Sequence, residues 1–185
     1  NKKKKKLPKI LIVGGVGYIG SILCNKLLRK GYEVKIVDKV LYDKSVVNNF
    51  KKNKNFSFIK ADICDLNTQI NAIKDIDVVI FLAEIVGDPA CNARPEDALK
   101  TNYLSIASMA QLCSYLGISK FIYTSSCSVY GLDKENKLLT EKSNLNPISH
   151  YARMKIMSEK ALLANKNDIF KPTIFRLGTV FGPSL

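Results

Sequence analysis

Short apolar runs rich in β-branched residues alternate along this chain with longer stretches whose apolar positions recur at helical spacing. The short runs predict strands near Ile10–Val13, Val34–Asp38, Phe56–Ile59, Val78–Leu82, Phe121–Ser125 and Thr173–Leu177. The longer stretches predict helices near Tyr18–Lys30, Asn67–Ile73, Pro95–Leu116 and Ser149–Ala164. Such alternation is typical of βαβ units around a parallel sheet. The pattern therefore predicts the α/β class, with one doubly wound parallel sheet.

Polar stretches between these elements predict loops rather than domain linkers. Asn48–Asn55 is expected to be a polar loop. Asp133–Pro147 is a longer polar connection, and its length is typical of an active-site loop. Because no stretch divides the chain, residues 9–185 are expected to form one domain behind a lysine-rich tail at residues 1–8.

A cluster of glycines lies between the first predicted strand and the first predicted helix. Gly14, Gly17 and Gly20 have the spacing GxxGxxG, with an additional glycine at Gly15. Gly14 and Gly15 are expected to permit a sharp turn, and Gly17 a close approach of a ligand to the backbone. Gly20 is expected to let the helix lie close to the sheet. The N–H groups around Gly17 to Ile19 then favour an anion, and the expected anion is a pyrophosphate.

An acidic residue ends the second predicted strand. Gly31 is the expected C-cap of the first helix, and Asp38 is the last residue of the second strand, about 20 residues past the glycines. A carboxylate there accepts hydrogen bonds from an adenosine ribose and repels a 2′-phosphate, which favours NAD over NADP. Lys39 weakens that preference slightly. The simpler alternative is a glycine turn beside an ordinary surface aspartate.

Composition narrows the class of protein. A length of 185 residues and a hydrophobic content of 46% suit one soluble globular domain. No apolar run approaches the roughly 18 residues of a membrane span, and no signal peptide is evident, so a cytoplasmic protein is expected. The cysteines are odd in number and never in CxxC spacing, which argues against a disulfide framework and a metal site. They are Cys24, Cys64, Cys91, Cys113 and Cys127.

The net charge of +13 raises the question of an anionic partner. A lysine-rich tail can steer a protein to nucleic acid or to an anionic surface. Basic and aromatic residues are not interleaved, however, as they are in surfaces that bind single strands. A solvated tail with a compositional bias is the favoured interpretation, and nucleic acid is not an expected partner.

Candidate catalytic chemistry lies near the last predicted helix. Tyr151 and Lys155 are four residues apart and therefore share one helix face. An ammonium near a phenol lowers the pKa of the phenol, so the pair can act as a general base on an alcohol. The serines that end the fifth strand could bind the same substrate oxygen, or could merely satisfy backbone groups. His150 is expected to point to a different helix face.

Ligands of a doubly wound sheet bind beyond the carboxyl ends of its strands. The residues that follow the third to sixth predicted strands therefore outline one crevice. They are Asp62 and Ile63, Ala83 and Glu84, Ser125 and Ser126, and Gly178 and Thr179.

In these features the chain resembles the extended short-chain dehydrogenases/reductases, specifically the NAD-dependent epimerase/dehydratase family that acts on nucleotide sugars. The resemblance covers nearly the whole chain and implies a Rossmann fold. The matching residues are GGVGYIG at Gly14–Gly20, Asp38, KADICD around Asp62, FLA at Phe81–Ala83, Pro95, Asn102, SSCSVYG at Ser125–Gly131, Glu141, Pro147, YARMK at Tyr151–Lys155, Glu159 and RLGTVFGPS at Arg176–Ser184.

The resemblance also implies roles for individual residues. Ser126, Tyr151 and Lys155 correspond to the catalytic set, in which Tyr151 takes a hydroxyl proton, Lys155 stabilises the phenolate and Ser126 steadies the keto oxygen. Ser128 and Thr179 are candidate substrate contacts. The implied NAD-binding residues are Gly14, Gly17, Tyr18, Ile19, Gly20, Asp38, Asp62, Ile63, Leu82, Ala83, Glu84, Asn102, Tyr151 and Lys155.

The chain departs from the family pattern in three places. Cys127 and Ser128 stand where 4,6-dehydratases carry Asp-Glu, which disfavours dehydration. Phe81 and Glu84 replace a histidine and a small residue common in the family. Family members also continue with a portion that grips the substrate nucleotide, whereas this sequence stops at Leu185, so a fragment of a longer protein is expected.

An NAD-dependent nucleotide-sugar epimerase is the leading interpretation, with a homodimer formed through the two long helices. A nucleotide-sugar or carbonyl reductase with the same residues is the nearest alternative. A non-catalytic NAD-binding protein is the alternative from another class, against which the complete Ser-Tyr-Lys set argues.

Overall fold

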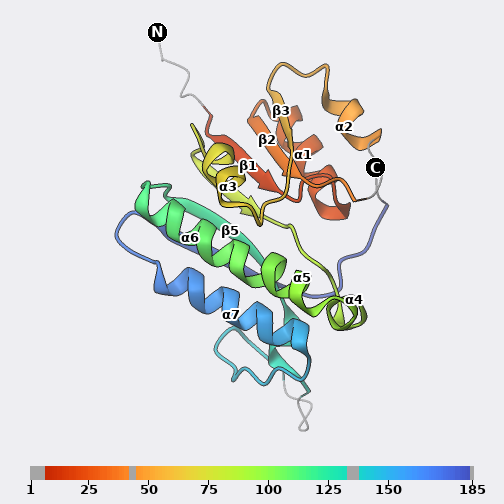
Figure 1. The fold of residues 1–185 in the computed structure, drawn as a ribbon, viewed down its shortest axis with the longest axis vertical. Coiled ribbons are helices and arrows are strands. Elements are labelled where there is room, and N and C mark those ends of the chain that lie inside the picture. The colour runs from red at the N-terminus through yellow and green to blue at the C-terminus, as the bar shows by residue number, and fades with distance from the viewer. Residues whose placement is uncertain (1–6, 42–44, 133–137, 184–185) are drawn as a thin grey trace.

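A computed structural model describes residues 7–41, 45–132 and 138–183 of the chain. Its centre is one sheet of parallel strands in the order β3-β2-β1-β4-β5-β6 (Figure 1). This order is the Rossmann arrangement, whose switch point lies between β1 and β4. The strands are β1 Lys9–Val13, β2 Glu33–Asp38, β3 Phe56–Lys60, β4 Val78–Phe81, β5 Lys120–Ser126 and β6 Lys171–Leu177.

Helices cover both faces of the sheet (Figure 1). Side chains of α1 and α2 pack on one face, and those of α3, α6 and α7 on the other. A π-helical turn, Lys100–Leu104, joins α5 to α6, and a short 3₁₀ turn, Cys127–Tyr130, follows β5. The α-helices are α1 Tyr18–Arg29, α2 Ser45–Phe50, α3 Leu66–Ala72, α4 Asp88–Ala93, α5 Pro95–Leu99, α6 Ser105–Tyr115 and α7 His150–Ala164.

The central strands owe their position to apolar runs that are buried on both faces. All four residues of β4 are buried, as are Ile10–Val13 of β1. Continuous apolar runs of this kind suit a parallel sheet covered by helices on both sides. The two central strands therefore form the buried base of the sheet, and Ala83 and Glu84 of the predicted crevice follow the carboxyl end of β4.

The predicted α/β class, the parallel sheet and its six strands are confirmed. The predicted loop at Asn48–Asn55 is wrong in its first part, because α2 extends to Phe50 and buries Val46, Val47 and Phe50. Lys30, rather than the predicted Gly31, is the C-cap of α1, and Gly31 follows with a positive φ of 84°.

The predicted long helix Pro95–Leu116 is interrupted. Its middle turn is π-helical, and Leu116 is the C-cap of α6. The additional helix α4 begins after Gly87, with Pro89 in its first turn. These differences lie on the side of the sheet that carries α7, with Tyr151 and Lys155.

The structure describes only parts of the lysine-rich tail and of the expected active-site loop, and it bears on membrane spans only within the described residues. No helix in the described part of the chain is long and apolar enough to cross a membrane. Most of the lysine-rich tail, residues 1–6, and residues 133–137 of the expected active-site loop lie outside the described residues.

Candidate active site

The glycine turn at the switch point is built around two close backbone contacts. Gly14 has a φ of +79°, and a Cβ there would lie 2.5 Å from the backbone nitrogen of Ala83 after β4. A Cβ on Gly20 would lie 2.6 Å from the carbonyl oxygen of Gly14. The turn can therefore pack against the end of β4 only because Gly14 lacks a side chain, and the first turn of α1 can pack against the turn only because Gly20 lacks one.

Gly15 has a different role from the one that the sequence predicts. Its φ is not among the positive values of the chain, so it supplies no special turn conformation. A Cβ on Gly15 would instead lie 2.6 Å from the side chain of Ile36 on β2. Gly15 is thus required by packing against the sheet rather than by backbone strain.

The N-terminus of α1 fits an anionic group. Its N-cap is Gly17, which supplies no side-chain hydrogen bond, and the first turn contains no acidic residue. A Cβ on Gly17 would meet only the Gly14 carbonyl oxygen, at 3.4 Å, so space remains beside it. Tyr18 and Ile19 begin this helix, and the Tyr18 hydroxyl donates to the Gly182 carbonyl at 2.5 Å. The arrangement can hold a phosphate by backbone N–H groups and helix dipole.

Asp38 lies at the end of β2 beside this turn. Its Oδ2 accepts a hydrogen bond from the Val16 N–H at 3.0 Å, and its Oδ1 accepts one from the Val40 N–H at 2.8 Å. These bonds fix the carboxylate next to the glycine loop, as a ligand of an adenosine ribose requires. The fit of the turn and this carboxylate to a dinucleotide is therefore good.

An ion pair joins the ends of β2 and β3. The Lys39 ammonium lies 2.7 Å from Oδ2 of Asp62, and both side chains are partly exposed. Although burial opposes its charge, hydrogen bonding to Lys39 lowers the pKa of Asp62. Ile63, the other residue predicted to border an adenine, is buried in the core. The Lys39 ammonium is therefore paired with the Asp62 carboxylate.

The segment after β4 is fixed by a buried amide. Asn102, in the π-helical turn, accepts from the Ile85 N–H at 2.9 Å and donates to the Ile85 carbonyl at 2.8 Å. This pair of bonds holds the chain that follows Leu82, Ala83 and Glu84. Asn102 is therefore a support of the crevice wall, and the irregular turn places its side chain there.

The structure brings together the three residues of the predicted catalytic set. Ser126 ends β5, and Tyr151 and Lys155 lie on successive turns of α7. The Lys155 ammonium lies 5.6 Å from the centre of the Tyr151 ring and donates to the Thr124 carbonyl. Ser126 Oγ accepts from the Ser128 N–H at 3.1 Å and lies 2.8 Å from Ser128 Oγ. A hydroxyl substrate beside Tyr151 would meet the acid–base group and a hydrogen-bond partner together.

Glu84 also belongs to this group, in a way that the sequence did not predict. Its Oε2 lies 2.7 Å from the Lys155 ammonium and accepts from the Tyr151 hydroxyl at 3.4 Å. Burial raises the pKa of Tyr151, and the neighbouring Glu84 carboxylate raises it further, while a hydrogen bond with Ser126 acts in the opposite direction. Burial likewise lowers the pKa of Lys155 against the attraction of Glu84. The resting site therefore favours a protonated phenol.

A second ion pair, between the buried Glu159 and the partly exposed Arg176, supports β5. Glu159 on α7 accepts from Ser125 Oγ at 2.5 Å and from Arg176 of β6, whose Nη2 lies 2.7 Å from Oε2. Arg176 also donates to the Tyr130 hydroxyl at 3.0 Å. Hydrogen bonding to Glu159 raises the pKa of Arg176. Glu159 and Arg176 belong to the stretches that resemble the family, and the structure shows that they tie α7, β5 and β6 together.

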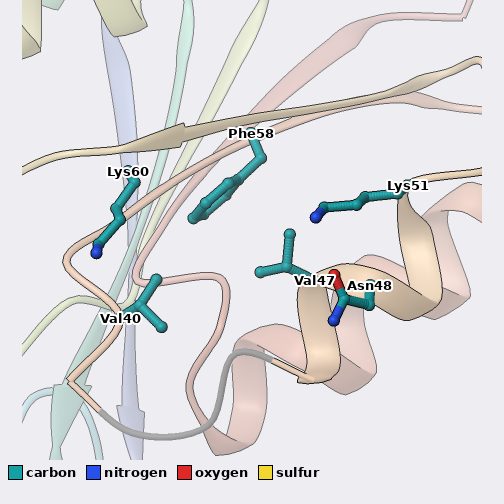
Figure 2. Close-up of a pocket in the computed structure, with 6 residues that line it drawn as sticks. All are labelled: Val40, Val47, Asn48, Lys51, Phe58 and Lys60. Atoms are coloured by element: carbon teal, nitrogen blue, oxygen red, sulfur yellow. The ribbon is translucent and has the colours of Figure 1, made fainter.

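The remaining candidates lie at the edge of the site or away from it. Thr179 is exposed after β6, and His150 is exposed at the start of α7. A further cavity of about 200 Å³ lies beside α2 and β3, and Figure 2 shows side chains that line it. None of the predicted site residues lines this cavity, which lies between Val40, Val47, Asn48, Lys51, Phe58 and Lys60.

Comparisons with known proteins agree with this geometry. The sequence profile of the NAD dependent epimerase/dehydratase family matches residues 10–184. The chain is 30% identical over 181 residues to UDP-glucose 4-epimerase of Lactobacillus helveticus, covering 95% of this chain and 53% of that protein. It is 28% identical over 182 residues to the decarboxylating sterol-4-alpha-carboxylate 3-dehydrogenase of Bos taurus, covering 96% of this chain and 48% of that protein.

Among solved structures, the chain is similar to UDP-glucuronic acid 4-epimerase from Bacillus cereus in complex with UDP-glucuronic acid and NAD. The TM-score is 0.86 at 28% sequence identity, with 95% of this chain and 58% of that chain covered. The chain therefore spans about half the length of the relatives that it matches.

Proposed function

This chain belongs to the NAD dependent epimerase/dehydratase family, and from that premise we propose that it is the cofactor-binding and catalytic part of a nucleotide-sugar epimerase. The observation that carries the proposal is the meeting of Ser126, Tyr151 and Lys155 at the same carboxyl edge of the sheet as the glycine turn and Asp38. Similarity to 4-epimerases of UDP-sugars supports the substrate class.

NAD is the proposed cofactor. The N–H groups of Gly17–Ile19 would hold its pyrophosphate, Asp38 its adenosine ribose, and Asp62 and Ile63 its adenine. Leu82, Ala83 and Glu84 would border it, with Asn102 behind them and Tyr151 and Lys155 at its reactive end. The pairing of Lys39 with Asp62 supports NAD over NADP, because that ammonium is already engaged by a carboxylate.

The proposed reaction uses Tyr151 as the base for a sugar hydroxyl. When bound, NAD would supply a reversible hydride acceptor next to the sugar carbon, which allows that carbon to be oxidised and then reduced on its other face. Lys155 stabilises the Tyr151 phenolate, and Ser126 donates to the keto oxygen. Ser128, held at Ser126 Oγ, and the exposed Thr179 are the proposed substrate contacts.

Conversion of UDP-glucose to UDP-galactose without net NADH formation tests this proposal. Tyr151→Phe should abolish turnover while leaving the circular dichroism spectrum and NAD binding unchanged. Tyr115→Phe is the matched control, because Tyr115 is 88% exposed at the end of α6. Full activity of Tyr151→Phe would refute the assigned mechanism.

A dehydrogenase or reductase that uses the same residues is the second candidate. Similarity to the sterol-4-alpha-carboxylate 3-dehydrogenase favours it. Substrate-dependent net change in NADH or NADPH absorbance would identify this activity, since an epimerase returns the hydride it removes.

We also propose a cytoplasmic homodimer that associates through α6 and α7. These helices lie side by side (Figure 1), and Leu104, Met157 and Leu163 on or beside them remain exposed. All five cysteines are free thiols, the state typical of a reducing compartment. Light scattering during size exclusion should give twice the mass of the chain, and Leu104→Glu should reduce it. A monomeric wild type would refute the dimer.

A further inference from the structure

A buried carboxylate stands between the two residues that carry the proposed proton transfer. The Glu84 side chain is 9% exposed and that of Lys155 only 2%. One oxygen of Glu84, Oε2, contacts both the Lys155 ammonium, at 2.7 Å, and the Tyr151 hydroxyl, at 3.4 Å. The other oxygen, Oε1, is buried with no hydrogen-bond partner among the described residues.

The lysine is thereby directed away from the phenolic oxygen. Its ammonium is paired with Glu84 and donates to the Thr124 carbonyl. It also lies 4.8 Å from the centre of the Tyr123 ring and 5.6 Å from that of Tyr151. A cation held in this way stabilises the carboxylate more than it stabilises a phenolate.

We propose that Glu84 is a positioning residue that holds Lys155 and the Tyr151 hydroxyl in a resting arrangement, in which the phenol keeps its proton. Tyr151 becomes a base only when Lys155 exchanges Glu84 for the phenolic oxygen. This inference rests on the proposed role of Tyr151 in the epimerase reaction.

The charges around Tyr151 support this arrangement. Tyr151 faces the Glu84 carboxylate from the segment after β4, the Lys155 ammonium from α7, the Cys91 thiol from α4 and the Ser126 hydroxyl from the end of β5. Burial and the first of these groups raise the pKa of Tyr151, and the hydrogen bond with Ser126 lowers it. Removal of the Glu84 charge removes the repulsion and also releases Lys155 toward the phenol.

The surroundings of Lys155 do not offer an equivalent partner. Besides Glu84, the ammonium faces the ring of Tyr123 on β5 and, electrostatically, Glu159 and Cys91. Glu159 is bound to Arg176 and Ser125, so its oxygens are already engaged. Release from Glu84 therefore leaves the phenolic oxygen as the favourable acceptor for the lysine.

Titration of Tyr151 by NMR tests the inference without requiring turnover. The full chain is prepared with tyrosine labelled by ¹³C at the ring Cζ, and Tyr151→Phe identifies the Tyr151 signal. In the wild type, Tyr151 should stay protonated at about pH 10, where free tyrosine is half ionised. In Glu84→Gln, the acid dissociation constant of Tyr151 should rise at least about tenfold.

Two further variants make the result decisive. Glu84→Asp keeps a negative charge beside Lys155 but, with its shorter side chain, withdraws that charge from Tyr151. The pKa of Tyr151 in this variant should therefore lie between its values in the wild type and in Glu84→Gln. A fall relative to the wild type can be measured even if Glu84→Gln fails to fold. Glu96→Gln makes the same chemical change at an exposed residue of α5 and should have no effect. Ionisation of wild-type Tyr151 below about pH 10, or no change in folded Glu84→Gln or Glu84→Asp, would overturn the inference.

The pH profile of turnover provides a second readout. In an active enzyme, Glu84→Gln should move the acid limb of kcat/KM to lower pH, whereas a purely structural loss would lower the rate at every pH. The NMR titration does not depend on turnover. An inactive wild type would therefore contradict the proposed epimerase function without changing the result on Glu84, and the two proposals can be refuted separately.

Discussion

Substitution of Gly20 by alanine should damage both the fold and the cofactor site, although glycine-to-alanine changes inside helices usually stabilise. A Cβ at this position would lie 2.6 Å from the Gly14 carbonyl oxygen and 2.6 Å from Gly15 Cα. Nonbonded carbon atoms prefer about 3.5–4.0 Å, so the helix and the turn would have to separate by about 1 Å. The atoms in contact are backbone and cannot rotate away.

The expected size of the effect follows from two opposing contributions. Alanine in place of glycine favours a helix by about 1 kcal/mol. Forcing additional atoms into a packed site costs about 1–3 kcal/mol, and a rigid backbone turn places Gly20 at the upper end. The net loss in the free energy of unfolding should be about 2 kcal/mol.

Urea unfolding followed by circular dichroism measures this loss. With a slope of about 2 kcal/mol per molar urea, the midpoint should fall by about 1 M. Gly17→Ala is the matched control, because its Cβ would meet only one backbone oxygen, at 3.4 Å, and should cost less than about 1 kcal/mol. A Gly20→Ala midpoint equal to or above that of the wild type would refute the packing argument.

Further predictions concern the cofactor site, the thiols and the buried ion pair. Asp38→Ala should weaken NAD binding at least about tenfold by calorimetry and NADP binding less; equal losses would contradict a ribose ligand. Iodoacetamide at about pH 8 should label the exposed Cys127 first, because burial raises the pKa of Cys24 and Cys113 to about 12; mass spectrometry showing equal rates would contradict this order. Glu159→Ala should lower the free energy of unfolding by about 3 kcal/mol in urea, since it removes the carboxylate that pairs with Arg176 and accepts from Ser125; a loss below about 1 kcal/mol would contradict that role.

The strands were predictable because their signal is local and repeated. Apolar β-branched runs such as Ile10–Val13 define strands that are buried on both faces, and the glycines that follow β1 mark its turn. The helix α2 was not predictable in the same way. Its six residues are too few to establish a helical period, and Asn48 and Asn49 made the segment look like a loop. For α4, Gly87 followed by Pro89 was an available signal of a helix start.

The site shows the same division between local and non-local information. The four-residue spacing of Tyr151 and Lys155 places them on one face of α7 from sequence alone. The contact of Lys155 with Glu84 joins residues from different elements, and no local pattern specifies it. The sequence did not reveal the role of Asn102 in the π-helical turn either. The Asn102 side chain bonds to the backbone of Ile85, which lies earlier in the chain, and no local pattern specifies such a contact.

Native mass spectrometry of the purified chain with NAD and NADP tests the central claim most directly. The glycine turn, the uncapped N-terminus of α1 and the oriented carboxylate of Asp38 should give one NAD bound per chain, in preference to NADP. Binding of neither dinucleotide, or preference for NADP, would contradict the account.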